Sequence, residues 1–278
     1  MGGTLAVGVG VSGTALGVGG RVKLFELQKK LSRGEATCGL WVRLASSETT
    51  EIAADVGLDW VCLDMEHGHL GWDDIHRHLC AAEGTKLSVI VRIPAIALEP
   101  LKRALDLGAD AALLPLVRSA EEVRWAVDMS RYPRMGHRTL GQERATRWGL
   151  RMAEYVSAIG DGGLVIPIIE TEDALVSIAE ILRVDGVQAI FIGTGDLSAA
   201  RGRVGQWLAP EVRHDVEEVQ RCAQEKGIAV GIVASASADI AYCRESGVRM
   251  LGLGYDTDCL IAGMQQRMAT AKGNGERV

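Results

Sequence analysis

Two carboxylates follow apolar runs in the second half of the chain and could hold a metal ion. Glu170 comes directly after the run LVIPII at 164–169, and Asp196 comes after the run QAIFI at 188–192 and a short glycine turn. Carboxylates without a cysteine or histidine partner suit a hard divalent cation such as Mg²⁺ or Mn²⁺, with water and substrate oxygens completing the coordination. The alternative is that each acid only favours the start of the helix that follows it.

An arginine and a histidine follow two earlier apolar runs. Arg92 ends the run LSVIVR, where a guanidinium could bind a carboxylate or a keto oxygen, or form a structural ion pair. His67 comes shortly after Asp64 in the segment DMEHGH, so two carboxylates are close enough in sequence to orient its imidazole. The pattern indicates His67 as a general base with Asp64 as its orienting partner.

The same segment allows a second interpretation. Glu66, His67 and His69 could bind zinc, although they lie too close in sequence to converge without a turn. Three further histidines fall in helical patterns and are expected at the surface; they are His76, His78 and His214.

A glycine-rich turn precedes Asp196. Gly193-Thr194-Gly195 offers successive backbone amides with little side chain, a pattern that can bind an anion such as a substrate carboxylate. An ordinary turn between a strand and a helix explains the glycines equally well. The first interpretation gives Gly195 and Asp196 a part in substrate binding.

The elements that must position these side chains repeat one pattern. Short apolar runs alternate with helical patterns from residue 22 onward, which is typical of βα units around a parallel sheet. We predict eight strands, at about 38–42, 60–64, 87–92, 111–116, 164–169, 188–192, 228–233 and 250–254. Eight such units favour an α/β fold of the (βα)8 TIM-barrel type. In that fold the candidate residues meet at the carboxyl ends of the strands.

The chain of 278 residues divides into one barrel domain, 23–272, and two tails, 1–22 and 273–278. The first tail is rich in glycine, and Gly8, Gly10 and Gly13 match the dinucleotide-binding pattern GxGxxG. That pattern requires a helix at its third glycine, and no helical pattern follows here. We therefore predict a flexible tail rather than a nucleotide site.

Composition excludes several classes of partner. Thirty basic against 36 acidic residues give a net charge of −6, which argues against a nucleic-acid-binding protein. The uncharged first twenty residues lack the basic start of a signal peptide and contain too many glycines for a membrane helix. Six scattered cysteines without a CxxC pair are typical of reduced, buried thiols. We expect a cytoplasmic protein with no nucleic-acid or membrane partner.

One long polar connection, 130–151, separates the fourth and fifth predicted strands. It contains six arginines and a single glutamate, in an otherwise acidic protein. Long loops are often functional. The segment is either a solvated loop or subunit contact, or a cationic guide for an anionic substrate.

Six motifs occur in order along the predicted barrel. They are GLWVRLASS from Gly39, LDMEHG around Asp64, VRIP from Val91, LLPLV from Leu113, IIET from Ile168 and FIGTGDLS from Phe191. Together they resemble the HpcH/HpaI family of class II, metal-dependent pyruvate aldolases. The similarity extends over about 25–268, and it implies an activity like that of 4-hydroxy-2-oxoheptanedioate aldolase.

The resemblance implies a role for each candidate in catalysis. Glu170 and Asp196 would hold a divalent ion, Mg²⁺, Mn²⁺ or Co²⁺. Arg92 would contact the keto oxygen of pyruvate, and His67 would be the acid/base group oriented by Asp64. Cleavage of a 4-hydroxy-2-oxo acid would then release an aldehyde and a metal-bound pyruvate enolate, with no Schiff-base lysine.

The resemblance also implies the pocket and the assembly. Trp41 would line the pocket, and backbone amides around Gly195 and Asp196 would bind the pyruvate carboxylate. Family members are usually hexamers, so a homo-oligomer is expected, with the helix after Asp256 as a contact between subunits.

Three departures from the family pattern bear on specificity. Thr194 and Gly195 stand where GPADLS is common, and Ile168 stands where glutamine is frequent. A citrate-lyase-like acyl-CoA lyase and a related enzyme, such as an oxaloacetate decarboxylase or a synthase, are therefore alternatives. A non-catalytic barrel is a third.

Overall fold

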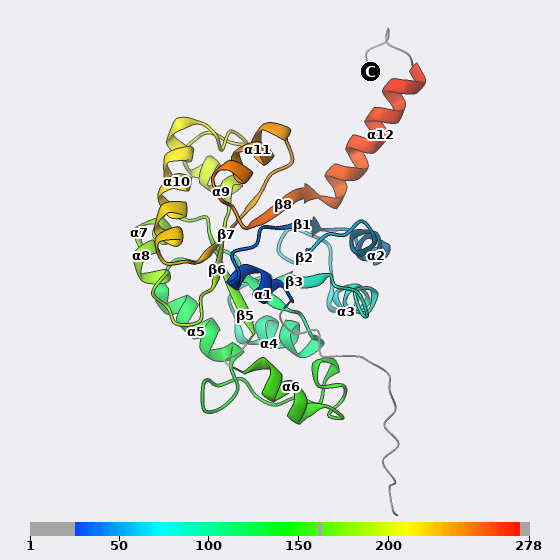
Figure 1. Ribbon diagram of the computed structural model, residues 1–278, viewed down its shortest axis with the longest axis vertical. Coiled ribbons are helices and arrows are strands. Elements are labelled where there is room, and N and C mark those ends of the chain that lie inside the picture. The colour runs from blue at the N-terminus through cyan, green and yellow to red at the C-terminus, as the bar shows by residue number, and fades with distance from the viewer. Residues whose placement is uncertain (1–25, 161–162, 273–278) are drawn as a thin grey trace, which may run out of the picture.

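The computed structural model describes residues 26–160 and 163–272, and its centre is a closed barrel of eight parallel strands in sequential order (Figure 1). The strands are β1 (Thr37–Val42), β2 (Trp60–Asp64), β3 (Ser88–Arg92), β4 (Ala111–Leu114), β5 (Leu164–Ile169), β6 (Ala189–Ile192), β7 (Ala229–Val233) and β8 (Met250–Tyr255). All eight predicted strands are confirmed. The fourth is shorter than predicted, because its ladder ends at Leu114 and not at Leu116.

Helices surround the barrel (Figure 1). They are α1 (Glu26–Ser32), α2 (Glu48–Asp55), α3 (Trp72–Ala81), α4 (Leu98–Leu107), α5 (Ala120–Ser130), η1 (Arg144–Thr146), α6 (Met152–Ile159), α7 (Glu172–Val176), α8 (Ile178–Ile181), α9 (Thr194–Ala200), α10 (Pro210–Glu225), α11 (Ser237–Glu245) and α12 (Asp256–Lys272). Side chains that alternate along each buried strand point either into the barrel or toward these helices. The chain therefore builds two apolar layers from the same strands.

Aromatic rings fill the inside of the barrel. Trp60 and Phe191 meet edge to face with their centroids 6.2 Å apart, and Trp41 lies 5.5 Å from Phe191. Glycines on the neighbouring strands leave room for them, since a Cβ atom at Gly39 would overlap the Trp60 ring and one at Gly231 would overlap the Phe191 ring. The small residues thus determine where the large ones pack.

Helix α1 closes the amino-terminal end of the barrel (Figure 1). Its buried Leu27 and Leu31 belong to the same apolar cluster as Trp60, Leu164 and Met250, which stand at the start of their strands. With this end covered, the polar residues at the opposite ends of the strands face the open mouth of the barrel.

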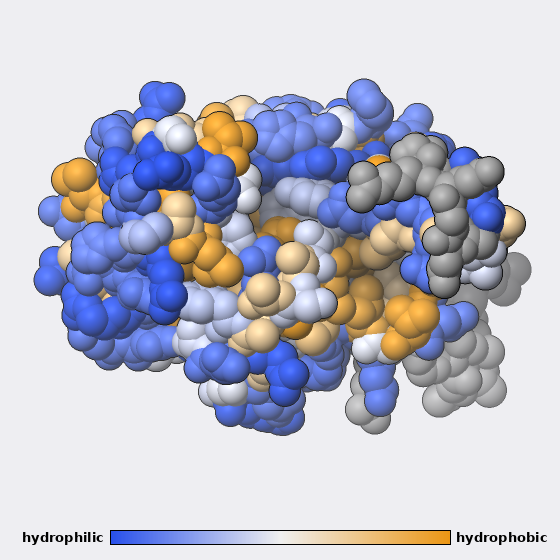
Figure 2. Space-filling view, turned by 90° about the horizontal axis from the view of Figure 1, so that it is seen from above, coloured by the Kyte–Doolittle hydropathy of each residue, from blue (hydrophilic) through white to orange (hydrophobic). Residues whose placement is uncertain are grey.

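Helix α12 leaves the barrel after β8 and extends away from it (Figure 1). Its large apolar side chains are exposed; they are Leu260, Ile261, Met264 and Met268. Hydrophobic residues also gather around a hollow on the otherwise hydrophilic face in Figure 2. Among the described residues, no helix is both long and apolar enough to span a membrane.

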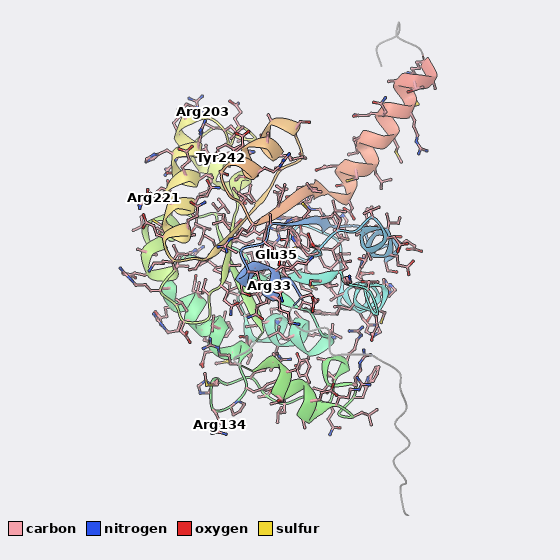
Figure 3. The ribbon with its side chains drawn as sticks, viewed as in Figure 1. Arg33, Glu35, Arg134, Arg203, Arg221 and Tyr242 are labelled. Carbon is pink, nitrogen blue, oxygen red and sulfur yellow. The ribbon has the colours of Figure 1, made fainter. Side chains whose placement is uncertain are left out.

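The arginine-rich connection lies at the closed end of the barrel. Arg144 donates to the carbonyl oxygens of Leu79 and Leu107, at the carboxyl ends of α3 and α4, and Arg147 pairs with Glu83. Arg134 lies at the outer edge of the molecule (Figure 3). These contacts fix the connection on the face opposite the strand ends, so it does not guide substrate into the mouth of its own barrel.

Three sequence predictions concern residues that the structure does not describe. The tails 1–22 and 273–278 and the GxGxxG pattern at Gly8, Gly10 and Gly13 lie beyond the residues that the structure describes. All six cysteines are free, as expected, but Cys80 and Cys259 are exposed rather than buried.

Replacing Gly39 by alanine tests the packing inside the barrel. Because the added methyl group overlaps the buried Trp60 ring, we expect the free energy of unfolding to fall by about 3 kcal/mol in urea denaturation. Gly263→Ala is the control, since a Cβ there meets no neighbour and alanine favours a helix, so stability should stay the same or rise by up to about 1 kcal/mol. Equal losses in both variants would contradict this packing argument.

Candidate active site

The polar residues expected at the carboxyl ends of the strands do meet there. Asp64 ends β2 and pairs in register with Arg92, the last residue of β3. Glu170 follows β5, and Asp196 lies in the first turn of α9, directly after β6. Because parallel strands end on the same rim, these four side chains border one mouth.

The carboxylate of Asp64 is completely buried and receives five hydrogen bonds. Arg92 donates two, from Nε at 2.9 Å and Nη2 at 2.6 Å, and Arg43 donates one from Nε at 3.0 Å. The backbone N–H groups of Glu66 and His67 donate the others, both at 3.1 Å. Asp64 therefore holds the segment after β2 as well as two guanidinium groups.

These contacts keep the buried pair charged. Burial alone would raise the pKa of Asp64, but Arg92, the His67 N–H and Arg43 together lower it below its ordinary value. Burial likewise opposes the charge of Arg92, and the neighbouring carboxylates Asp64 and Glu66 still raise its pKa. Both groups are ionised at neutral pH.

His67 lies at the mouth, with a half-exposed side chain. Its bond to Asp64 comes from the backbone N–H, and the carboxylate beside its imidazole is that of Glu66, with Nε2 3.9 Å from Oε2. Asp64 thus positions the backbone of His67, and Glu66 is the acid that faces the ring. The same Oε2 atom lies 2.7 Å from Nη1 of Arg92. The two atoms form an ion pair, but their orientation is not that of a hydrogen bond.

Glu170 is buried on the other side of the mouth. Its Oε1 accepts the backbone N–H of Leu116 at 2.6 Å, and Leu116 adopts a left-handed conformation with φ of 50° to present that N–H. A leucine rarely adopts this conformation, which costs of order 1–3 kcal/mol. The left-handed turn explains why β4 ends before Leu116, and the sequence gives no signal for it.

Gly193 leaves the space that Glu170 occupies. A Cβ atom at Gly193 would lie 2.5 Å from both Cβ and Oε2 of Glu170. At Gly195, by contrast, a Cβ would meet nothing within 4 Å. The two glycines of the same turn therefore have different roles, and only Gly193 is required by packing.

Negative charge around Glu170 is not compensated by the protein. Burial raises the pKa of this carboxyl to about 7, the charges of Asp196 and Glu66 add to the rise, and the Leu116 N–H and Arg92 oppose it. Burial also raises the pKa of Glu66, and Asp64 and Asp196 add to that rise against the charge of Arg92. A cation at this position would remove the repulsion.

The donor set fits a hard divalent ion with an open coordination sphere. Within 26–160 and 163–272, no group of three or more histidine, cysteine, aspartate or glutamate side chains could hold a metal. Glu170 and Asp196 can supply two carboxylates, one buried and one exposed. Such a pair suits Mg²⁺ or Mn²⁺, which retain water and bind substrate oxygens. Zinc held by Glu66, His67 and His69 does not fit this geometry.

Helix α9 begins at Thr194, so Gly195 and Asp196 lie in its first turn. The first N–H groups of a helix have no partner within it. The Gly193 N–H, however, donates to the carbonyl oxygen of Ile169. The backbone N–H groups available for an anion are therefore those in the first turn of α9, and the N–H of Gly193 is not among them.

Arg43 and two aromatic residues complete the mouth on the side of β1 and β8. Trp41 is buried and lies under the Arg92 guanidinium, whose Cζ is 4.6 Å from the ring centroid. Tyr255 lies under Arg43 in the same way, at 3.8 Å. Arg43 and Tyr255 are functional candidates that the sequence analysis left unassigned. Each stands at the end of a strand, and that position was the signal in the sequence that could have identified it.

His78 is buried and not at the surface, which corrects the expectation from its helical pattern. Its Nδ1 lies 2.7 Å from the hydroxyl of Thr50 and its Nε2 lies 3.2 Å from the carbonyl oxygen of Leu44. Burial lowers the pKa of His78, so the ring is neutral, donates from Nε2 and accepts from Thr50. It therefore supports the loop that follows Arg43.

Comparisons with known proteins identify the family to which this fold belongs. Residues 37–262 match the family model described as HpcH/HpaI aldolase/citrate lyase. The chain belongs to this family. A 2-keto-3-deoxy-L-rhamnonate aldolase of Escherichia coli strain K12 is 34% identical over 256 residues, which cover 90% of this chain and 95% of that protein. The predicted resemblance is confirmed.

Solved structures of the family share the fold. A family protein of Burkholderia cenocepacia J2315 superposes with a TM-score of 0.85 at 29% identity, covering 90% of this chain and all of that one. An aldolase of Desulfitobacterium hafniense DCB-2 gives 0.83 at 32% identity, with 88% and 96% covered. The chain is therefore an enzyme, an aldolase of the carbon–carbon lyase class, on a (βα)8 barrel.

Asp64→Asn tests the buried charge pair. Loss of the anion leaves Arg92 buried without its partner, so we expect the free energy of unfolding at neutral pH to fall by about 3–5 kcal/mol. Because folding lowers the pKa of Asp64, its contribution is complete above about pH 4 and disappears as the pH falls through the lower folded value. Urea denaturation at several pH values should show the two proteins converging in acid.

The control for this variant is Asp185→Asn, which removes an exposed partner of Arg131 and should cost less than about 1 kcal/mol. A wild-type advantage that grew toward low pH would contradict the assignment of a lowered pKa to Asp64.

Gly193→Ala tests whether the turn of this aldolase makes room for Glu170. The methyl group would displace the Glu170 carboxylate, so we expect Mn²⁺ binding, measured by electron paramagnetic resonance, to weaken roughly 10- to 100-fold. Gly195→Ala is the matched control, because its added Cβ has open space and leaves Glu170 in place. If both variants bind Mn²⁺ equally well, Gly193 has no such role.

Proposed function

We propose that this aldolase cleaves and forms 4-hydroxy-2-oxo acids through the enolate of pyruvate, with Glu170 and Asp196 as the ligands of a divalent metal ion. The observation that carries the proposal is the uncompensated charge beside Glu170, whose pKa burial and Asp196 raise to about 7. Arg92, two strands away on the same rim, pairs with Asp64 and Glu66 and still has further N–H donors. One side of the site is thus prepared for a cation and the other for an anion.

Glu170 and Asp196 would hold the divalent ion, which would supply Lewis-acid stabilisation of the enolate. Mg²⁺ and Mn²⁺ suit the two carboxylates, because carboxylate and water are their preferred ligands, and Co²⁺ is the third ion that we propose. Leu116 and Gly193 keep the Glu170 carboxylate in position, the first through its N–H and the second by leaving space.

Arg92 stabilises the developing oxyanion from the protein side. Its guanidinium has five N–H donors, of which Nε and Nη2 use two on Asp64, while Nη1 forms an ion pair with Glu66. The remaining donors can bond to the keto oxygen of pyruvate, while Trp41 lies against the guanidinium face and forms a wall of the pocket. Fixed donors of this kind need no reorganisation during the reaction.

His67 moves the proton. In cleavage its imidazole takes the proton of the C4 hydroxyl group, the C3–C4 bond breaks, and the products are an aldehyde and the pyruvate enolate. Protonation of the enolate at C3 then gives pyruvate, and condensation runs the same steps in reverse. Glu66, 3.9 Å from Nε2, stabilises the protonated ring, and Asp64 positions the backbone of His67.

The first turn of α9 binds the carboxylate of the 2-oxo acid. The amides of Gly195 and Asp196 point from a helix amino terminus, where an anion is stabilised, and they stand beside the metal ligands. The Escherichia coli relative is named for a 2-keto-3-deoxy sugar acid, which has the same 2-oxo acid end. We take pyruvate as the common nucleophile and an aldehyde as its partner.

Other features support the assembly and the location that we propose. The exposed apolar side chains of α12, including Leu260 and Met264, support a contact between copies in a homo-oligomer, for which we propose a hexamer. Six free cysteines support a reducing compartment, the cytoplasm.

Exchange of the pyruvate methyl protons with solvent deuterium, followed by NMR, tests the proposal directly. We expect exchange that ceases with EDTA and returns with Mg²⁺ or Mn²⁺. Asp196→Asn should slow the exchange by at least about 100-fold. Loss of one group that stabilises a developing oxyanion typically has an effect of this size. Glu225→Gln on α10, which is exposed and paired with Arg221, should leave the rate unchanged.

Exchange that is insensitive to chelation would exclude the metal-dependent mechanism. Turnover of malyl-CoA without turnover of any 4-hydroxy-2-oxo acid would instead favour an acyl-CoA lyase. A folded Asp196→Asn protein with wild-type exchange would remove Asp196 from the site.

A further inference from the structure

Arg43 stands at the rim between three strands. It follows the last residue of β1, and its neighbours in the barrel are β2, which ends in Asp64, and β8, which ends in Tyr255. The side chain of Arg43 contacts both of these residues. It is thus part of the mouth of the barrel and not of the outer surface.

The guanidinium of Arg43 is fixed in place. Its Nε donates to Oδ2 of Asp64 at 3.0 Å, and its Cζ lies 3.8 Å from the centroid of the Tyr255 ring. The backbone is held too, because the N–H of Arg43 donates to the buried carboxylate of Asp256 at 3.2 Å. A group restrained in this way loses little entropy when it binds a ligand.

The outer edge of this guanidinium is available. Within the described chain, Nη1 and Nη2 of Arg43 form no hydrogen bond and no ion pair, and neither is among the buried atoms that lack a partner. The side chain is 29% exposed, so both nitrogens reach solvent. Arg92 differs, because it is 5% exposed and uses all three nitrogens on Asp64 and Glu66.

The position of Arg43 determines which part of a substrate it can meet. In the closed barrel β5 is four strands from β1 in either direction, so Glu170 lies across the mouth from Arg43. The carboxylate of pyruvate lies beside Glu170 and Asp196 under the proposed function. A group at Arg43 must therefore belong to the other end of the substrate, which the aldehyde contributes.

We propose that the Nη edge of Arg43 binds a carboxylate on the aldehyde substrate and so selects anionic aldehydes. The inference rests on the proposed function. Two parallel N–H donors match the two oxygens of a carboxylate. A singly charged carboxylate fits better than a dianionic phosphate, because Asp64 already occupies Nε of the same guanidinium and Glu66 lies nearby.

Competition between matched aldehydes tests this role. Glyoxylate and succinic semialdehyde, each paired with its methyl ester, would be condensed with pyruvate and Mg²⁺, and kcat/KM measured for each. We expect the wild-type enzyme to prefer at least one acid over its ester. In Arg43→Gln that preference should fall roughly 10- to 100-fold, mainly through KM of the acid. Arg43→Lys keeps the positive charge but not the planar pair of N–H donors. Its preference for the acid over the ester should lie between those of the wild-type enzyme and Arg43→Gln.

Two controls separate binding from support of Asp64. Proton exchange of pyruvate proceeds without an aldehyde. A slower exchange in Arg43→Gln would therefore report a loss of activity that is transmitted through Asp64 and not a loss of aldehyde binding. Arg118→Gln removes an exposed arginine after β4, with the same change in net charge. It should leave the preference for acid over ester unchanged.

The outcomes distinguish the possible failures. A wild-type enzyme that prefers neither acid over its ester would overturn the proposal. So would an Arg43→Gln protein in which condensation with the acid, condensation with the ester and pyruvate proton exchange all slow by the same factor. If Arg118→Gln and Arg43→Gln lost the preference for the acid equally, the overall positive charge of the rim would explain the effect. That result would also overturn the proposal. A wild-type enzyme with neither proton exchange nor product would reject the proposed function itself.

Discussion

The mouth of the barrel depends on one buried carboxylate. Asp64 is inaccessible to water, so its charge is stable only because Arg92, Arg43 and two backbone N–H groups donate to it. Removing a charge from water costs several kcal/mol, and only a complete set of donors compensates for it. The same bonds fix both guanidinium groups and the segment that presents His67. The positions of the catalytic candidates are therefore consequences of satisfying a single anion.

The rim separates charges that the protein neutralises from charges that it does not. On the side of β1 to β3, Asp64 and Glu66 face Arg92 and Arg43, and these charges balance. On the side of β5 and β6, burial raises the pKa of Glu170 to about 7, and the carboxylate of Asp196 adds to that rise. A stable protein rarely leaves such repulsion without a use. A divalent cation bound there would remove this imbalance.

Much of this arrangement could be predicted because strand positions follow from apolar runs, and a parallel barrel brings all strand ends to one rim. Register alone places Asp64 beside Arg92. Side-chain geometry could not be predicted in this way. The left-handed turn at Leu116 presents a backbone N–H to Glu170, and no sequence pattern marks it. His78 is buried although His76 and Arg77 before it are polar and exposed. Which atom of His67 contacts Asp64 likewise depends on the path of the chain after β2.

The two sides of the mouth also differ in how firmly they are held. The loop after β1 is fixed from both directions, since Asp256 accepts the N–H groups of Arg43 and Leu44 and the neutral ring of His78 donates to the Leu44 carbonyl oxygen. Asp196, in contrast, is exposed in the first turn of a short helix. A rigid guanidinium can discriminate between substrates because it does not adapt to them. Under the proposed function, adjustment on metal binding therefore falls to Asp196, whose side chain is exposed.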